Sequence, residues 1–325
     1  MGKKTDSDSQ TEKILRYRRL IYPESIVNVS QSEISAFNSA ELLRKRKLRK
    51  ILRPRKKNIT VDSFIVPVSD NASISAYLFR KQSGNADMLN SLIIYLHDGG
   101  WVFGNMDLCN AVCSNICDYT GVSVLALDYR LAPVFRFPIP AEDCFNAYQW
   151  AVQGARYWKK DPSRIYVMGS CAGGNLAIAV CRLARDRKTE MPAGLILINP
   201  ITDCRLKTNS IEKHKNDSML SERELNTFIS YYMREPKDIL NPLFSPMLAP
   251  DNSRFPETLI FASEEDPLFD DAKLYSLALT NADTPCKLMT TKGSSHFMIN
   301  FPTLKTWTET MDVIKNFICG INTVS

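Results

Sequence analysis

The segment with the clearest chemical potential is GSCAGGN at residues 169–175, which lies between a strand-like apolar run and a helix-like run. Small residues on both sides of Cys171 permit a sharp strand-to-helix turn that holds the side chain at its tip over the sheet. Cys171 would then lie at a helix N-terminus, whose dipole favours a thiolate over a thiol. The N–H of Ala172 would point toward a developing oxyanion. These features predict a thiol nucleophile.

A carboxylate and a histidine follow two later strand-like runs. Asp266 comes just after residues 258–263 (TLIFAS), and His296 follows residues 286–291 (CKLMTT). Because the carboxyl ends of parallel strands meet at one edge of a sheet, we expect both side chains to lie close to Cys171. The order nucleophile, acid, histidine along the chain is the one found where such a triad is built at the edge of a parallel sheet. His296 would take the thiol proton, and Asp266 would orient the imidazole.

A glycine-containing loop, HDGGW at residues 97–101, directly follows the apolar run 92–96 (LIIYL). Gly99 and Gly100 offer unobstructed N–H groups for the same oxyanion, and losing one such donor typically costs about 2.7–4 kcal/mol of transition-state stabilisation. For His97 we expect a supporting role, in which it holds the loop by hydrogen bonds and does not transfer protons. Trp101 and Phe103 fit either the pocket wall or the core.

Short strands alternate with helices along most of the chain, beginning with a hairpin. The expected strands cover residues 61–68, 74–80, 92–96, 122–128, 165–169, 195–199, 258–263 and 286–291, and helical periodicity is clearest at 142–152, 172–185 and 271–281. Strands separated by helices indicate right-handed crossovers and a mostly parallel sheet with helices on both faces. The fold class is therefore α/β.

The segment 201–240 breaks this rhythm, because it is polar and then helical from a capping box at Ser221 and Glu224. It is too long for a simple connection, and an insertion at this edge of the sheet would cover the ligand crevice. We expect a helical lid formed by 201–240 together with an N-terminal helical arm at 1–60. Residues 61–200 and 241–325 would then form the core.

The composition is that of a globular protein, since 44% of the 325 residues are apolar and 23% are charged. No apolar run approaches the ~18 residues that a membrane-spanning helix needs. The first residues, MGKKTDSDSQTEK, lack the apolar stretch of a secretory signal. Nine cysteines, an odd number, suggest reduced thiols. We expect a soluble, cytoplasmic protein.

A basic segment at residues 44–57 holds ten Lys and Arg and no acid. It fits either a solvated helix face or a patch that makes weak contact with an anionic membrane. Because the rest of the chain shows no nucleic-acid-binding module, no nucleic-acid partner is expected. The sequence leaves the oligomeric state open.

Neither a metal nor a cofactor is expected. Cys109, Cys113 and Cys117 repeat every four residues on a predicted helix, but no His or fourth thiol lies nearby, so core packing is favoured over a zinc site. The run 169–174 lacks the lysine of a phosphate-binding loop. Asp270 and Asp271 are expected to charge the start of the next helix.

Taken together, the motifs resemble the hormone-sensitive-lipase-like branch of the α/β-hydrolase esterases, which includes bacterial acetyl esterases and carboxylesterases. The family's HGGG, GDSAGG and DPL motifs and its late histidine are matched here by HDGGW, GSCAGGN, DPLFDD and SSHF. DYRLAP (128–133), FPIPAEDC (137–144) and NPLFSP (241–246) also resemble the family. The resemblance runs from Leu92 to the C-terminus.

The resemblance implies an α/β-hydrolase fold with a lid, and hydrolysis of small acyl esters without metal or cofactor. Carried over position by position, it implies that Cys171 is the nucleophile, His296 the base and Asp266 the orienting acid. The oxyanion-hole donors would be Gly99, Gly100 and Ala172.

The sequence departs from the family at three positions. Asp98 replaces the first glycine, Ser170 replaces the acid before the nucleophile, and Cys171 replaces serine. Three outcomes stay open: a thiol hydrolase or acyltransferase that uses a thioester, an esterase impaired by the sulfur atom, or a non-catalytic small-molecule receptor. The retention of Asp266 and His296 argues against a receptor. We therefore expect a carboxylic-ester hydrolase for small, short-chain acyl esters.

Overall fold

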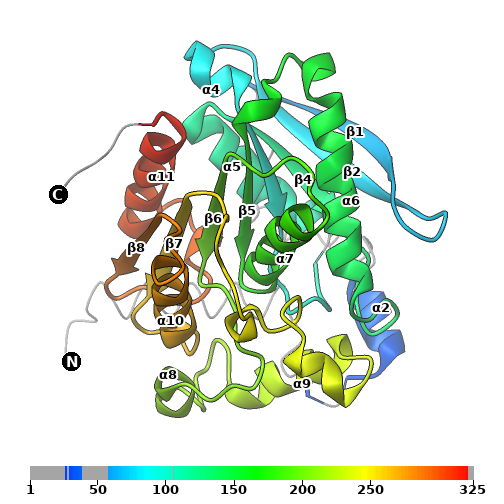
Figure 1. Cartoon of the computed structure of the whole chain (residues 1–325), viewed down its shortest axis with the longest axis vertical. Coiled ribbons are helices and arrows are strands. Elements are labelled where there is room, and N and C mark those ends of the chain that lie inside the picture. The colour runs from blue at the N-terminus through cyan, green and yellow to red at the C-terminus, as the bar shows by residue number, and fades with distance from the viewer. Residues whose placement is uncertain (1–25, 28, 39–57, 105, 321–325) are drawn as a thin grey trace, which may run out of the picture.

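The computed structural model describes residues 26–27, 29–38, 58–104 and 106–320 (Figure 1). Within these residues the strands form a single eight-stranded sheet with the order β1-β2-β4-β3-β5-β6-β7-β8. Their bounds are β1 Ile59–Pro67, β2 Ser73–Lys81, β3 Leu92–Leu96, β4 Ser123–Asp128, β5 Ile165–Ser170, β6 Gly194–Ile198, β7 Thr258–Ser263 and β8 Cys286–Thr291. The predicted strands are confirmed, with ends that shift by one or two residues.

The pairing of the strands is mostly parallel. β1 and β2 form the predicted antiparallel hairpin, and β2 also pairs antiparallel with β4. All pairs from β4 through β8 are parallel. Strands covered on both faces read as continuous apolar runs, and every residue of β3, β5, β6 and β7 is buried.

Helices cover both faces of this sheet (Figure 1). Their bounds are α2 Gln31–Asn38, α4 Ala86–Asn90, α5 Met106–Thr120, α6 Ile139–Gly154, α7 Ala172–Asp186, α8 Asn209–Lys213, α9 Glu222–Tyr232, α10 Phe269–Thr280 and α11 Lys305–Ile318. α5 packs against α11, and α6 packs against α7, which lies on β3, β5 and β6. The α/β-hydrolase fold class expected from the sequence is confirmed.

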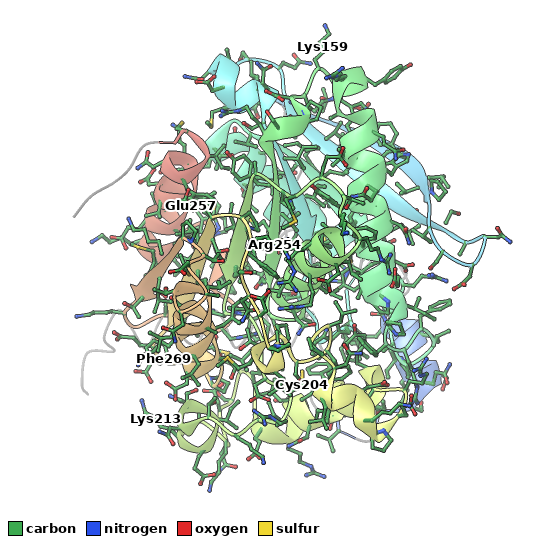
Figure 2. All side chains as sticks on the ribbon, in the orientation of Figure 1. Lys159, Cys204, Lys213, Arg254, Glu257 and Phe269 are labelled. Atoms are coloured by element: carbon green, nitrogen blue, oxygen red, sulfur yellow. The ribbon has the colours of Figure 1, made fainter. Side chains whose placement is uncertain are left out.

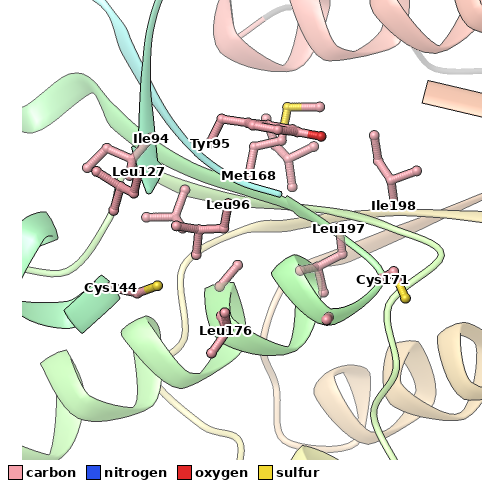
Figure 3. Packing of buried hydrophobic residues seen from close by; sticks show 14 of the residues in the cluster. Ile94, Tyr95, Leu96, Leu127, Cys144, Met168, Cys171, Leu176, Leu197 and Ile198 are labelled. Atoms are coloured by element: carbon pink, nitrogen blue, oxygen red, sulfur yellow. The ribbon is translucent and has the colours of Figure 1, made fainter. Parts of the chain in front are cut away.

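The core lies between the central strands and these helices. Figure 3 shows Leu96 and Leu197 on the face of the sheet toward Leu176 of α7, and Met168 beside Tyr95 on the other face; Leu96, Leu197, Leu176 and Met168 are fully buried. Truncating such a leucine to alanine typically costs about 2–5 kcal/mol, because the removed atoms leave a cavity. Cys171 lies at the margin of this cluster, where β5 ends.

The segment between β6 and β7 carries α8 and α9, which lie together at one end of the molecule (Figure 1). The capping box expected at the start of α9 is present, since Ser221 Oγ accepts from Glu224 N and the Glu224 carboxylate accepts from Ser221 N. Figure 2 shows Lys213 of α8 at the surface, whereas Cys204 at the base of the segment is buried.

Two aspartates tie this segment to α10. Asp270 accepts a hydrogen bond from Ser210 N at 2.9 Å, and Asp271 accepts from Thr202 N at 2.8 Å and Asp203 N at 2.9 Å. Both lie in the first turn of α10, as expected, but their carboxylates serve the insertion as well as the helix start.

Cys109, Cys113 and Cys117 of α5 are all buried in the hydrophobic core. Burial raises the pKa of the Cys113 thiol well above its usual range, as it does for the other two. The core packing favoured from the sequence is thus what the structure shows.

None of the described helices is both long and apolar enough to cross a membrane. The basic segment 44–57 lies outside the described residues, as does most of the predicted N-terminal arm. The cytoplasmic location and the weak membrane contact stay predictions.

Candidate active site

Cys171 is the first residue after β5 and the N-cap of α7. Its backbone has φ 53° and ψ −118°, a conformation that L-residues rarely adopt and that is typical of a strained elbow. The turn requires glycine around it, because a Cβ on Gly169 would lie 2.0 Å from Gly173 O and one on Gly173 would lie 2.1 Å from Leu96 O. The sequence therefore folds into the sharp turn expected from its small residues.

His296 and Asp266 meet in the interior of the protein. Nδ1 of His296 lies 2.7 Å from Oδ2 of Asp266, and the two side chains are 2% and 0% exposed. Asp266 Oδ1 also accepts a hydrogen bond from Leu268 N at 2.9 Å, which fixes the carboxylate. Because the buried imidazole has one nitrogen bonded to a carboxylate, its orientation is set.

His296 lines the same pocket as Cys171. Since Nδ1 bonds to Asp266, Nε2 is the ring nitrogen left for the sulfur. Burial by itself lowers the pKa of His296, but the charges of Asp266 and Cys171 and its hydrogen bond with Asp266 hold that pKa well above its usual range. The structure thus brings together the three side chains that the sequence singled out.

The loop after β3 supplies two of the expected oxyanion donors. Gly99 and Gly100 have φ values of 109° and 61°, which favour glycine. A Cβ on Gly99 would lie 1.9 Å from Phe103 O. Within the described residues, the N–H groups of Gly99, Gly100 and Ala172 donate no hydrogen bond to the protein. In the part of the chain that the structure describes, these three N–H groups thus have no acceptor, as an oxyanion hole would require.

His97 supports this loop from beneath. Its Nδ1 lies 2.6 Å from Asp98 O, and its ring stacks on Tyr129 at a centroid distance of 4.2 Å. A Cβ on Gly104 would lie 2.2 Å from the imidazole. Burial lowers the pKa of His97, and His97 is not among the described residues that line the pocket. This geometry fits the supporting role expected from the sequence.

The pocket at Cys171 contains about 330 Å³ of space between atoms, part of which is open to solvent. Besides the expected residues, its wall is formed by residues from the N-terminal segment, the insertion and the loop after β8, namely Ile26, Met219, Leu220, Glu224, Phe228 and Phe297. Sequence reasoning placed a lid here but missed these residues, although the capping box located the helix that carries Glu224 and Phe228. Trp101 and Phe103, which the sequence left undecided, are buried and are not among these lining residues.

Asp98 and Ser170, two of the residues that differ from the family's motifs, have different surroundings in the structure. Oδ2 of Asp98 accepts a hydrogen bond of 3.4 Å from Asn300 Nδ2, which links the loop after β3 to the residues that follow His296. Ser170 Oγ is buried and has no hydrogen-bond partner among the described residues.

The family comparison covers most of this site. The sequence model of a family described as alpha/beta hydrolase fold matches residues 93–300. An arylesterase of Saccharolobus solfataricus is 34% identical over 220 residues, which are 66% of this chain and 70% of the relative. An ethyl acetate hydrolase of Pseudomonas putida is 32% identical over 228 residues, which are 70% of this chain and 72% of the relative.

Solved structures agree with these relatives. An esterase of Pyrobaculum calidifontis superposes with a TM-score of 0.81 at 26% identity, over 95% of this chain and 99% of that one. The matched range runs from β3 to the residues after His296, and so includes the elbow, the acid and the histidine. The chain is therefore an esterase/lipase-like hydrolase that belongs to the α/β-hydrolase fold family, in its hormone-sensitive-lipase-like esterase branch.

Proposed function

We propose that this protein hydrolyses short-chain carboxylic esters through a Cys171–His296–Asp266 triad and a covalent acyl-thioester. The observation that carries the proposal is the position of His296, which bonds to Asp266 through Nδ1 at 2.7 Å and lines the same pocket as Cys171. This arrangement lies at a pocket that also includes Gly99 and Gly100. A nucleophile, an oriented base and free N–H donors are what acyl transfer requires.

In the first half of the reaction, the proton of Cys171 Sγ passes to Nε2 of His296. The sulfur attacks the acyl carbon, and the electron pair of the carbonyl double bond moves to oxygen, where the N–H groups of Gly99, Gly100 and Ala172 bind it. The electron pair then returns, the bond to the alcohol oxygen breaks, and that oxygen takes the proton from His296. An acyl-thioester on Cys171 is left.

In the second half, water attacks the thioester carbon while His296 takes its proton. The oxyanion forms again in the same place, and its collapse breaks the carbon–sulfur bond. The carboxylic acid leaves, and the proton returns from His296 to Sγ. Asp266 keeps its negative charge throughout and stabilises the imidazolium each time it forms.

The proposed preference for short acyl chains rests on the lining of the pocket. Phe228 and Phe297 form part of the wall, and bulky aromatic rings leave little room for a long acyl chain. We also propose that residues 201–240 act as the lid, together with the N-terminal arm, because Met219, Leu220 and Ile26 line the pocket.

The test compares the turnover of p-nitrophenyl acetate, butyrate and octanoate by the wild type, Cys171→Ala and Cys171→Ser, with intact mass spectrometry to detect an acyl adduct. We expect turnover to fall with chain length, and Cys171→Ala to lose both turnover and adduct. Cys144→Ala is the matched control, because this thiol of α6 is buried in the core outside the pocket.

Other results would support other functions. Turnover only in Cys171→Ser would identify an esterase impaired by sulfur, and no adduct in any variant would favour a receptor. If added amines or thiols divert the acyl group from water, the protein is an acyltransferase. Wild-type turnover by Cys171→Ala would contradict the proposed nucleophile.

A further inference from the structure

In the loop that supplies Gly99 and Gly100, the next residue, Trp101, has a backbone conformation that is unfavourable for its side chain. Gly99, Gly100 and Trp101 all have positive φ, and Trp101 has φ 63°. Glycine adopts this region freely, but for a bulky side chain it is a genuine outlier. Such a conformation persists only where the surrounding structure holds it. The contacts of Trp101 therefore help to hold the backbone that follows the two N–H donors.

The ring of Trp101 is held by Tyr232, the last residue of α9. The two rings are stacked at a centroid distance of 4.5 Å with an interplanar angle of 7°, and they are 1% and 0% exposed. Tyr232 is fixed in turn, because it stacks on Phe244 at 4.9 Å and its carbonyl accepts a hydrogen bond from Phe137 N at 2.9 Å. Trp101 is thus packed against a rigid partner.

Ring contact alone makes this connection. Trp101 Nε1 and the Tyr232 hydroxyl are both buried, and neither has a hydrogen-bond partner in the part of the chain that the structure describes. Among the described residues, Trp101 and Tyr232 are therefore connected by the faces of their rings.

α9 touches the same loop at a second point. Phe228 lies one turn before Tyr232, so both side chains are on one face of the helix. A Cβ on Gly100 would lie 2.3 Å from the Phe228 ring, so this ring occupies the space beside the glycine. Phe228 lines the pocket, whereas Tyr232 is not among its described lining residues. The Tyr232 ring therefore contacts the loop after β3 through Trp101.

We infer that Tyr232 is a positioning residue for the oxyanion hole, whose ring fixes the Gly99 and Gly100 N–H groups by way of Trp101. The inference rests on the proposed function, since it assumes that these N–H groups bind the oxyanion. It assigns a part of the insertion to the chemistry itself as well as to covering the pocket. Misplacing a reacting or binding group by ~1 Å can cost about 10²-fold in rate.

The first measurement is kcat and KM for p-nitrophenyl acetate in Tyr232→Leu, Tyr232→Met and Tyr232→Phe. We expect the first two to lose about 10- to 100-fold in kcat, with little change in KM, because the loss arises in the transition state. Tyr232→Met fills the space flexibly and serves where Tyr232→Leu does not fold. Tyr232→Phe keeps the ring and is expected to have the wild-type kcat.

The matched control is Tyr148→Leu. Tyr148 of α6 is also a buried tyrosine, but its hydroxyl donates to Glu190 O at 3.0 Å, away from the loop after β3. We expect this variant to lose stability without losing kcat. If Tyr232→Leu or Tyr232→Met keeps the wild-type kcat, the inference is overturned.

A second pair of measurements separates the oxyanion hole from the triad. Alkylation of Cys171 by iodoacetamide needs the sulfur but no oxyanion, so its rate is expected to be unchanged in Tyr232→Met. A trifluoromethyl ketone forms a tetrahedral adduct with an oxyanion, so its affinity is expected to fall by the same factor as kcat. If the alkylation rate falls with kcat, Tyr232 acts on the triad and the inference is wrong.

These two measurements do not depend on ester turnover. A wild-type protein that binds the ketone but hydrolyses no ester would refute the proposed function and leave the role of Tyr232 testable by ketone affinity. A protein that hydrolyses esters with unchanged ketone affinity in Tyr232→Met would refute the role of Tyr232 alone.

Discussion

Nδ1 of His296 lies 2.7 Å from Oδ2 of Asp266, although the two residues are thirty positions apart and come from loops after different strands. Both side chains are buried, so water does not compete for this hydrogen bond. The bond fixes which ring nitrogen faces Cys171, and the catalytic proposal depends on that assignment.

Replacing Asp266 with asparagine tests this relationship. Asparagine keeps the shape of the side chain but loses its charge, so the imidazole can turn its other tautomer toward Cys171 and its protonated form is no longer stabilised. We expect kcat for p-nitrophenyl acetate to fall by about 10³- to 10⁴-fold. Glu265→Gln is the control, because it removes the charge of the neighbouring, exposed side chain. Equal kcat values for the two variants would contradict the assignment.

Replacing Asp271 with asparagine tests a pH effect. Burial raises the pKa of Asp271 to about 7 despite its hydrogen bonds with Thr202 and Asp203. A folded-state pKa above the unfolded value of about 3.9 means that the native state binds the proton more tightly. The contribution of the protonated Asp271 to the free energy of unfolding is complete below pH ~4 and is lost as the pH rises through about 7.

Asparagine at this position cannot ionise, and its oxygen can accept the bonds that Oδ1 accepts, while its amide replaces an Oδ2 without a partner among the described residues. We therefore expect Asp271→Asn to raise Tm at pH 8 by at least ~2 °C and to flatten the dependence of Tm on pH between 4 and 7. Thermal unfolding monitored by circular dichroism over this pH range measures both. A lower Tm at pH 8 would count against the buried ionised carboxylate.

The motifs DYRLAP and FPIPAEDC are joined by a buried ion pair. Asp143 accepts hydrogen bonds from Arg130 Nε at 2.8 Å and Nη2 at 2.6 Å, and the carboxylate is fully buried. Removing one partner leaves an uncompensated charge, so we expect Asp143→Ala to lower the free energy of unfolding by about 3–5 kcal/mol. Urea unfolding measures this loss.

A neighbouring pair is the control for that experiment. Glu142 pairs with Arg187 at 2.5 Å, but both side chains are partly exposed, at 23% and 42%. Exposed pairs contribute about 0–1 kcal/mol, so Glu142→Ala should have a small effect. Similar losses in the two variants would show that burial does not set the strength of these pairs.

The glycines of the elbow give a prediction about stability. A Cβ on Gly173 would lie 2.1 Å from Leu96 O, a backbone atom that cannot move without shifting β3. We expect Gly173→Ala to lower Tm strongly or to prevent folding, as judged by soluble yield and thermal unfolding. Gly84→Ala is the control, because its Cβ would lie 3.7 Å from Leu89, an ordinary contact. A Gly173→Ala protein with the wild-type Tm would show that the elbow tolerates a side chain.

The sequence was sufficient to predict the sheet and the three side chains at its edge. Cys171, Asp266 and His296 each follow an apolar run, and in a parallel sheet that position alone brings them together. The glycines near them are required by close backbone contacts, so their types were as informative as their spacing. The strands predicted from the apolar runs are those that the structure contains.

The wall of the pocket and the support of the oxyanion loop could not be predicted in the same way. Phe228 lies beside Gly100, and Tyr232 stacks on Trp101, although more than a hundred residues separate them in the chain. Such contacts depend on where the insertion folds back onto the sheet, and no local pattern encodes that. The capping box predicted where α9 begins but not which of its faces meets the loop.

The N-terminal segment contacts both the loop after β3 and the pocket. Asn38 of α2 donates from Nδ2 to Val102 O at 2.7 Å and accepts from Gly104 N at 3.3 Å, while Ile26 lines the pocket. A shortened chain that starts at β1 would retain every strand of the sheet. It would lose the hydrogen bonds of Asn38 to the loop after β3, and it would lose Ile26 from the wall of the pocket. Trimming the front of this protein to aid crystallisation would therefore alter its enzymology.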